Sequence, residues 1–316
     1  MTMTTAGARL GQNPVLTGLL TAPVAQSSFI AEKLFPRLPN ALRGMTLAAM
    51  GDEATRNYDT RRAPGTSTKQ VNISWSGKTF TVKQYSVDVP IPREILQEVD
   101  TASRLNVGAH LDVSRIAIST GLQVLNTGYE LEAANLALNP ANYAGNSLNI
   151  TGGDKWSAPT GKPVTQILQA SEAIRQKTGR RPNLLTLSAS ALLAISLNPE
   201  VKSYLPDTLL GSATIDQLKA IFKVAEIVVG ESVVKNGDDV TDIWGNNAVL
   251  AYVPNMAAGM ALGEPAFGFT NVLEGHPFAE QPRYDATLKS WVFGSTFERE
   301  CNIVTPGAGF LIQNPA

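Results

Sequence analysis

The feature that most constrains this chain is a long amphipathic stretch between about Val107 and Leu136. Its apolar residues recur at steps of three, four and seven, which is the spacing of one face of an α-helix. These residues are Leu111, Ile118, Leu122, Leu125, Tyr129, Ala133 and Leu136. A helix of about 30 residues is roughly 45 Å long, whereas ordinary globular helices have about 8–20 residues. The stretch predicts either the central helix of an α/β enzyme or the spine of an elongated subunit that tiles into a shell.

Three glycines interrupt this stretch, at positions 108, 121 and 128. Each costs about 1 kcal/mol relative to alanine in a helix interior. We therefore expect the helix to be packed against other elements along most of its length.

The composition favours a chain that hides surface by associating. It has 316 residues, with 43% hydrophobic and only 17% charged residues, and the charged share is below the usual quarter. A net charge of −1 gives no global signature of a nucleic-acid binder. Cys301 is the single cysteine, which excludes an internal disulfide, and we interpret it as a small buried apolar residue. No apolar run approaches the ~18 residues of a membrane span, and no convincing signal peptide is present, so we expect synthesis in the cytosol.

The first segment, residues 1–54, lacks regular periodicity and is rich in glycine and proline. We expect it to be an extended arm, because such a segment cannot bury itself well and is either disordered or laid on another surface. Within it, the run from Ser27 to Leu34 carries a helix-start pattern, with Ser28 as the expected cap.

Residues 55–90 carry strand patterns in VNISW, TFTVKQ and YSVDVPI, with a turn signal at Ser76-Gly77. This segment is strongly basic, with Asp59 as the only acid between positions 56 and 83. The basic residues are Arg56, Arg61, Arg62, Lys69, Lys78 and Lys83. A two-stranded hairpin is marginal in water by itself, so we predict an extended arm that docks on an acidic neighbour.

Two other interpretations of the basic hairpin remain open. One is a solvated hairpin without a partner; the other is a nucleic-acid ribbon, for which Trp75 and Phe80 alone do not form a stacking platform. The acids that we expect to receive a docked hairpin are Glu94, Glu98 and Asp100, or Glu130 and Glu132. A covalent cross-link from Lys69 or Lys78 would need a catalytic acid that nothing in the local sequence identifies.

The rest of the chain predicts a mixture of helices and strands. We expect a short helix with Pro92 in its first turn, and we expect the long helix to end at Asn139-Pro140. From Pro159 onward, helix and strand patterns alternate, which favours a mixed sheet flanked by helices. Gly179 is the expected end of the first of these helices, and Thr214 is the expected cap of the helix in ATIDQLKAIFKV. Residues 265–282 are expected to be loop, followed by strands in SWVFGSTFERECNIV and GAGFLIQ.

No known catalytic or metal-binding motif is present. The two histidines, His110 and His276, stand in no metal-ligand spacing, and the sequence contains no GxSxG, no P-loop and no GxGxxG after a strand. Asp238, Asp239 and Asp242 lack the alternation and the closing Glu of an EF-hand, so they predict a solvated turn. We expect no catalytic residue, no cofactor and no metal site.

The order of the segments resembles the major capsid proteins of tailed bacteriophages with the HK97-type fold. The similarity extends over nearly the whole chain and depends on four pieces: the helix followed by TGRRPN, the VGES strand after IDQLKAIF, DIWG, and the aromatic strand that leads into FERE. The resemblance implies an α+β fold with a spine helix and four regions. These are an N-terminal arm (1–54), an extended β-hairpin loop (55–90), a peripheral domain (91–158 and 264–305) and an axial domain (159–263 and 306–316).

The resemblance also implies partners and a location. It implies hexamers and pentamers in an icosahedral virion shell assembled in the host cytoplasm, with packaged double-stranded DNA held by weak non-specific contact. No long charged helical segment precedes the arm, so we expect a separate scaffolding protein, beside a portal and a decoration protein. The alternatives are an encapsulin-like nanocompartment shell and, from a different class, a cytosolic α/β enzyme without a recognisable motif.

Overall fold

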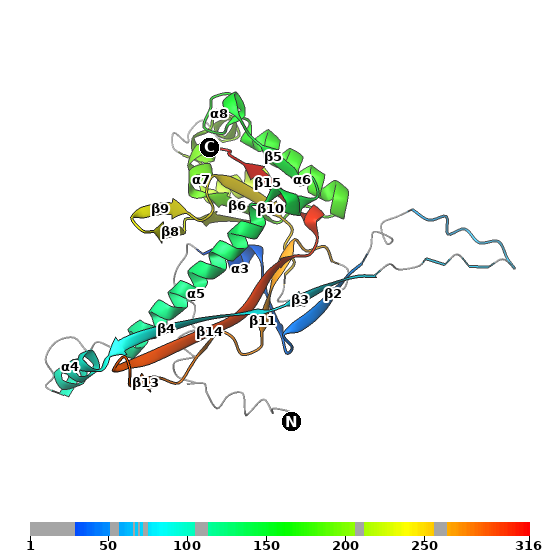
Figure 1. The fold of residues 1–316 in the computed structure, drawn as a ribbon. Coiled ribbons are helices and arrows are strands. Elements are labelled where there is room, and N and C mark those ends of the chain that lie inside the picture. The colour runs from blue at the N-terminus through cyan, green and yellow to red at the C-terminus, as the bar shows by residue number, and fades with distance from the viewer. Residues whose placement is uncertain are drawn as a thin grey trace.

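The fold is described from a computed structural model of the chain. The structure describes residues 29–50, 57–65, 67–68, 70–71, 75–104, 113–205, 212–255 and 264–316. One sheet runs along a long helix, a second sheet lies near the C-terminal end of that helix, and a two-stranded ribbon extends away from the first, lower sheet (Figure 1). The helices are α3 (Ala31–Leu34), α4 (Arg93–Arg104), α5 (Val113–Ala137), α6 (Pro163–Thr178), α7 (Ala189–Leu197), α8 (Pro199–Ser203) and α9 (Ile215–Phe222), with 3-10 turns at Pro140–Tyr143, Gly152–Asp154 and Pro306–Ala308.

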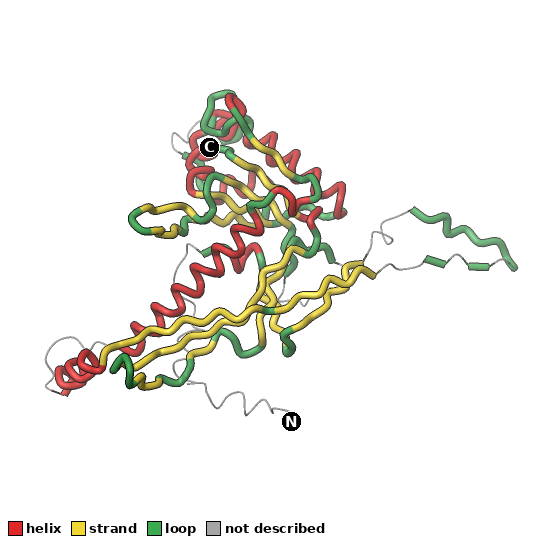
Figure 2. Tube along the Cα trace, in the orientation of Figure 1, coloured by secondary structure: helices red, strands yellow, loops and turns green. Residues whose placement is uncertain are grey.

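Helix α5 is the predicted spine. It has 25 residues, which at 1.5 Å per residue is about 38 Å. Ile118, Leu122 and Leu125 are buried on its inner face as the periodicity predicts, and Leu111 lies outside the described residues. Figure 2 shows the helix lying across the two longest strands of the structure. A Cβ at Gly121 would lie 3.0 Å from Ser295 Oγ, so this glycine allows the helix to approach the sheet closely.

The lower sheet has six strands and is built around β14. The path of the sheet is β1 (Arg37–Asn40), β11 (Gly268–Leu273), β14 (Ser290–Ile303) and β12 (Phe278–Ala279), with β13 (Arg283–Asp285) and β4 (Lys83–Pro92) also paired to β14. Strand β4 runs antiparallel to β14 over its whole length, from Lys83 opposite Arg299 to Pro92 opposite Ser290.

Two sequence predictions for this sheet are wrong. Pro92 is the last residue of β4, and helix α4 begins one residue later, at Arg93. The expected loop at 265–282 contains β11 and β12, because Gly268–Leu273 is almost entirely buried between β1 and β14. A Cβ at Gly268 would lie 2.4 Å from the Asn302 carbonyl oxygen. This glycine therefore marks a close strand approach instead of a loop.

The upper sheet has five strands in the order β5 (Ser147–Asn149), β15 (Gly309–Gln313), β10 (Asn247–Ala251), β6 (Leu184–Ser188) and β7 (Glu226–Gly230). The sheet is mixed, because β10 runs antiparallel to β15 and β6, whereas β6 and β7 are parallel. Helices α6, α7, α8 and α9 lie between its strands along the chain, so the predicted mixed sheet is confirmed. The expected caps are also found: Gly179 ends α6 in the left-handed conformation, and Thr214 forms a capping box at α9. Strand β5 pairs here, although the sequence division at residue 158 places it with the other sheet.

Two antiparallel ribbons stand outside the sheets. One joins β2 (Gly44–Met50) to β3 (Trp75–Thr81), and the other joins β8 (Val233–Asn236) to β9 (Asp239–Asp242). The predicted turn at Ser76-Gly77 is wrong, because both residues lie within β3 and pair with Ala49 and Ala48. The first strand of the hairpin therefore comes from the segment that we expected to be arm. In the second ribbon, Asp238, Asp239 and Asp242 are exposed as predicted, but only Asp238 lies in the turn, because Asp239 and Asp242 belong to β9 and pair with β8.

Candidate assembly surfaces

The part of the predicted arm that forms α3 is anchored on its own subunit by a buried carboxylate. Glu130 of α5 is fully buried. Its Oε1 accepts hydrogen bonds from the N–H of Ile30 at 2.8 Å and from Nε1–H of Trp244 at 2.6 Å, and its Oε2 accepts the N–H of Ala31 at 2.9 Å. Burial raises the pKa of Glu130, while these donors lower it. Glu130 therefore belongs to the interior of the subunit, and the prediction that it receives a neighbour's hairpin is wrong.

This contact also replaces the helix cap that the sequence predicted. The N-cap of α3 is Ile30, which has no side-chain capping bond, and Ser28 lies outside the described residues. The Glu130 carboxylate, 99 and 100 residues away along the chain, instead accepts the N–H groups at the start of α3. Sequence reasoning missed this role because no local pattern connects Glu130 to α3.

The FERE motif alternates between the two faces of β14. Phe297 and Arg299 point toward α5, and Glu298 and Glu300 point toward the other face. On the first face, the guanidinium of Arg299 lies over the rings of Tyr85 at 4.1 Å, Phe297 at 4.9 Å and Tyr129 at 5.2 Å. Burial lowers the pKa of Arg299, because it disfavours the charged guanidinium. The cation–π contacts with the three rings stabilise the charged side chain in this position.

Glu132 is part of this internal cluster. Its Oε2 lies 3.5 Å from Arg299 Nε, and its Oε1 accepts the N–H of Cys301 at 3.2 Å. Its carboxylate is therefore engaged within the subunit, like that of Glu130. The structure thus excludes both α5 acids as the docking site that the sequence suggested.

On the opposite face of β14, Glu298 and Glu300 hold the base of the β2–β3 hairpin. Glu298, only 4% exposed, receives two hydrogen bonds from Arg43: Nε to Oε2 at 2.8 Å and Nη2 to Oε1 at 2.6 Å. Glu300 accepts the N–H of Thr81 at 3.1 Å and lies 3.5 Å from Nζ of Lys83. These contacts join the start of β2 and the end of β3 to the body of the subunit.

The hairpin extends well beyond this base (Figure 1). Arg61 and Arg62 lie exposed between its two strands, and the carboxylate of Asp59 accepts the N–H of Arg61 at 3.1 Å. Trp75 and Lys78 lie in β3, whereas Arg56 and Lys69 fall outside the described residues. The structure therefore places the described members of the predicted basic set on one projecting element, except Lys83, which lies in β4 at its base.

The remaining predicted acids lie at the opposite end of the molecule. Glu94 and Glu98 are exposed on α4, which stands at the far end of β4 from the hairpin (Figure 1). Glu94 pairs with Arg93 at 3.0 Å, and hydrogen bonds from its own backbone N–H and from Arg93 lower its pKa. The basic hairpin and the acidic helix are thus too far apart to meet within one subunit.

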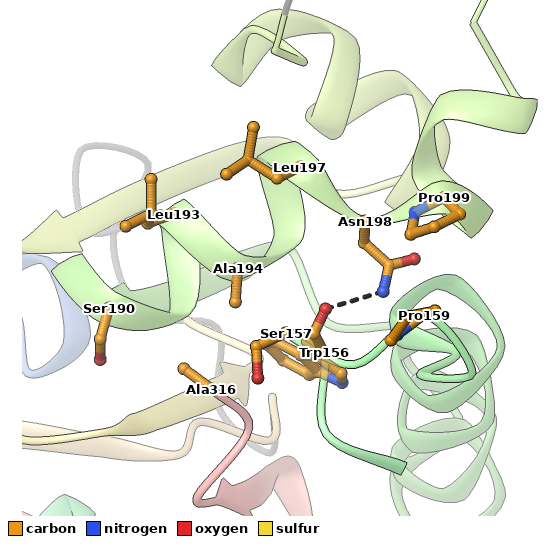
Figure 3. A pocket seen from close by; sticks show the side chains of 10 residues that line it. All are labelled: Trp156, Ser157, Pro159, Ser190, Leu193, Ala194, Leu197, Asn198, Pro199 and Ala316. Atoms are coloured by element: carbon orange, nitrogen blue, oxygen red, sulfur yellow. Dashed lines mark hydrogen bonds between the residues drawn. The ribbon is translucent and has the colours of Figure 1, made fainter. Parts of the chain in front are cut away.

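The structure offers a groove on the upper sheet, but the groove has no catalytic side chain. It has a volume of about 470 Å³ and lies between α7 and the C-terminal residue Ala316 (Figure 3). No lining side chain is titratable, and Nδ2–H of Asn198 is already bonded to the Trp156 carbonyl at 2.8 Å. Leu193 and Leu197 are 63% and 52% exposed at its edge. The side chains that line this groove are therefore mostly apolar.

The two histidines, which could take part in catalysis or metal binding, also form no exposed site in the part of the chain that the structure describes. His276 is buried against Glu298, and His110 lies outside the described residues. Among the residues that the structure describes, no group of three His, Cys, Asp or Glu side chains could hold a metal ion. In the same part of the chain, no helix combines the length and apolarity needed to cross a bilayer.

Cys301 is buried, as predicted, and burial raises the pKa of its thiol to about 12. Because the thiolate is the reactive form, we expect the native protein to remain unmodified by a thiol reagent at pH 8 and to react fully in denaturant. A surface cysteine introduced at Ser147 is the positive control. Rapid stoichiometric labelling of native Cys301 would contradict the buried position.

Comparisons with known proteins agree with this architecture. The major capsid protein of Burkholderia phage BcepMu is 31% identical over 306 residues, which cover 95% of each chain. A phage-related protein from Bordetella bronchiseptica RB50, known from its crystal structure, matches with a TM-score of 0.77 at 32% identity over 96% of this chain and 97% of that one. No protein-family model matches the chain.

More distant structures show the fold alone. The capsid protein of cyanophage P-SCSP1u matches with a TM-score of 0.57 at 12% identity, over 90% of this chain and 88% of that one. An encapsulin from Synechococcus elongatus matches with a TM-score of 0.54 at 11% identity, over 99% and 96% of the two chains. The fold is therefore the HK97-type fold that the sequence predicted, which phage capsids and encapsulins share. Because the major capsid protein of Burkholderia phage BcepMu is 31% identical to this chain and 95% of each chain is covered, the chain belongs to the bacteriophage major capsid proteins.

Proposed function

We propose that this protein forms a closed icosahedral shell of hexamers and pentamers in which each β2–β3 hairpin lies on the adjacent subunit. The observation that carries the proposal is the hairpin itself, which projects from the body and, in the part that the structure describes, is joined to it at its base. An isolated two-stranded ribbon is marginal in water. A neighbouring subunit would supply the missing packing.

The two ends of the subunit suit a head-to-tail contact. The hairpin carries Arg61 and Arg62 at one end, and α4 carries Glu94 and Glu98 at the other. A heterologous contact between two different surfaces generates a ring when the rotation closes. We therefore propose that the hairpin of one subunit reaches the α4 acids of the next, now that Glu130 and Glu132 are assigned to the interior.

The arrangement of the two sheets also supports a division of the subunit into a peripheral domain and an axial domain. The six-stranded sheet with α5 would form the peripheral domain, and the five-stranded sheet with α6 to α9 the axial domain. The pairing of β5 with β15 moves the boundary from residue 158 to just before Ser147. The shell would have no catalytic role and would package double-stranded DNA by weak contact, since a net charge of −1 gives little phosphate affinity.

Assembly would take place in the host cytoplasm with other proteins of the particle. The similarity to phage capsid proteins supports a separate scaffolding protein, a portal and a decoration protein as partners. Co-expression with the neighbouring genes, followed by electron microscopy, tests these partners one at a time.

Neutralising the hairpin tests the docking. We expect Arg61→Ala, Arg62→Ala and Lys69→Ala together to reduce particle yield about tenfold without changing the thermal midpoint of the subunit. An exposed ion pair contributes at most about 1 kcal/mol, and about 1.4 kcal/mol in total lowers an association constant tenfold. Particles and free subunits are separated by sedimentation velocity.

A control set and a charge swap make this test specific. Lys162→Ala, Lys202→Ala and Lys235→Ala remove three exposed charges elsewhere and should leave the yield unchanged. Arg61→Glu with Arg62→Glu should block assembly, and adding Glu94→Arg with Glu98→Arg should restore it. Unchanged yield in the neutralised variant would contradict docking by the hairpin, and failed rescue would contradict α4 as the acceptor.

A further inference from the structure

Three segments that are distant in the sequence meet at the carboxylate of Glu298. Arg43, which directly precedes β2, donates two hydrogen bonds to it although the Arg43 side chain is 66% exposed. His276 lies on the other side, with Nε2 4.0 Å from Glu298 Oε1 and its side chain 7% exposed. One buried carboxylate therefore faces one permanent cation and one side chain that can become a cation.

The position of Arg43 connects this carboxylate to the direction of the hairpin. The Arg43 carbonyl accepts the N–H of Val82 at 2.9 Å, which closes the base of the ribbon across its two strands. Beyond this point β2 and β3 pair only with each other. The Arg43–Glu298 pair is thus a contact between the base of the hairpin and β14 through which the orientation of the whole ribbon can be controlled.

His276 is held in its neutral form by geometry. Its Nδ1 accepts the N–H of Glu298 at 3.1 Å, and an imidazolium has no free lone pair for such a bond. The ring also packs edge-on against Phe278, with the ring centres 4.8 Å apart. The charged groups that face it are Glu298 from β14 and Arg43 from the base of the hairpin, and burial lowers its pKa below 6.5.

We propose that Glu298 is the positioning residue of the hairpin and that protonation of His276 releases the hairpin from its fixed direction. This inference builds on the proposed docking function, because a hairpin held at one angle meets a neighbour at a defined place. Protonated His276 loses the Glu298 N–H as a donor and attracts the carboxylate away from Arg43. The subunit then has one hairpin direction at neutral pH and a range of directions in acid.

The sign of the pH effect follows from linkage. A histidine whose pKa is lower in the folded form binds fewer protons there than in the unfolded chain, so its arrangement loses stability as the pH falls below 6.5. The fixed direction is therefore expected at pH 7.5 and its loss at pH 5. Arg43 keeps its charge over this range, because its hydrogen bonds to Glu298 raise its pKa further above the ordinary value.

The experiment measures the hairpin direction independently of assembly. Spin labels are placed at Thr60→Cys in the hairpin and Ser147→Cys in β5, both exposed in the full chain, and the buried Cys301 does not compete for label. Labelled protein is diluted into unlabelled protein so that only distances within one subunit are recorded. The distance distribution is measured at pH 7.5 and pH 5, beside thermal unfolding of each variant.

The variants separate positioning from folding. In the parent, we expect a narrow distance distribution at pH 7.5 that becomes broad at pH 5. In Glu298→Gln, we expect a broad distance distribution at both pH values. In His276→Gln, which cannot become a cation in this pH range, the distribution should stay narrow at both pH values. Glu280→Gln alters a carboxylate that bonds Thr296 and Arg283 on the same face and should behave as the parent. Arg43→Gln, at an exposed side chain, replaces Glu298→Gln if the latter does not fold.

Two results would overturn the proposal. One is a narrow distribution in Glu298→Gln or Arg43→Gln at pH 7.5, and the other is a pH response that survives in His276→Gln. If the distances behave as expected but the neutralised hairpin still assembles normally, the positioning role stands and the docking function fails.

Discussion

Replacing Leu122 with proline is expected to leave no folded subunit. Leu122 lies near the middle of α5 and is 3% exposed in the cluster that joins the helix to β4 and β14. Proline inside a helix removes a hydrogen bond and clashes with the preceding turn, which costs about 3 kcal/mol or more. Loss of the buried leucine adds about 2–5 kcal/mol. Together these effects are comparable with the whole stability of a typical domain, about 5–15 kcal/mol.

A second variant separates the backbone effect from the cavity. Leu122→Ala keeps every helical hydrogen bond and should fold with a lower unfolding free energy, by about 2–5 kcal/mol. Soluble yield, far-ultraviolet circular dichroism and thermal unfolding distinguish the two variants. A soluble Leu122→Pro protein that unfolds cooperatively would show that α5 is not the continuous spine described here.

Replacing Glu130 with alanine is expected to lower the unfolding free energy by about 3 kcal/mol or more, because three buried N–H groups lose their hydrogen-bond acceptor. The change leaves the N–H groups of Ile30 and Ala31 and the indole N–H of Trp244 without their acceptor. Each buried donor that loses its partner costs about 1–3 kcal/mol. Urea unfolding measures the change, and limited proteolysis near Ile30 should show release of α3.

The matched control for Glu130 is an acid on the surface. Glu94→Ala removes an exposed carboxylate from α4 and should change stability by no more than about 0.5 kcal/mol. Glu130→Gln, which keeps one acceptor oxygen, should fall between the two. A Glu130→Ala protein as stable as Glu94→Ala would show that the anchor does not hold α3.

Several parts of the fold could be predicted because their signals are local. The period of 3.6 identified α5, and Gly179 and Thr214 marked the end of α6 and the start of α9. The single buried cysteine and the exposure of the aspartate cluster were predicted from residue type and spacing alone, whereas the pairing of Asp239 and Asp242 within β9 was not. The order of these segments was also enough to identify the fold.

Other features depended on contacts between distant residues. Ser76-Gly77 resembles a turn, yet β2 pairs with that segment and makes it the middle of a strand. Residues 268–273 resemble a loop because they contain glycine and asparagine, yet burial between β1 and β14 makes them a strand. In both cases strand pairing overrode local preference, as β-propensity is strongly context-dependent.

The sequence by itself determined the helices, most of the strands and the membership of the capsid family, because periodicity, caps and segment order are written along the chain. Only the tertiary structure decided which charges are internal and which can face a neighbour. Glu130, Glu132 and Glu98 are the same residue type in helical context, and their roles differ because α3 and Arg299 lie against the first two and nothing covers Glu98 in the described subunit. Burial is set by elements a hundred or more residues away, and no local pattern records it.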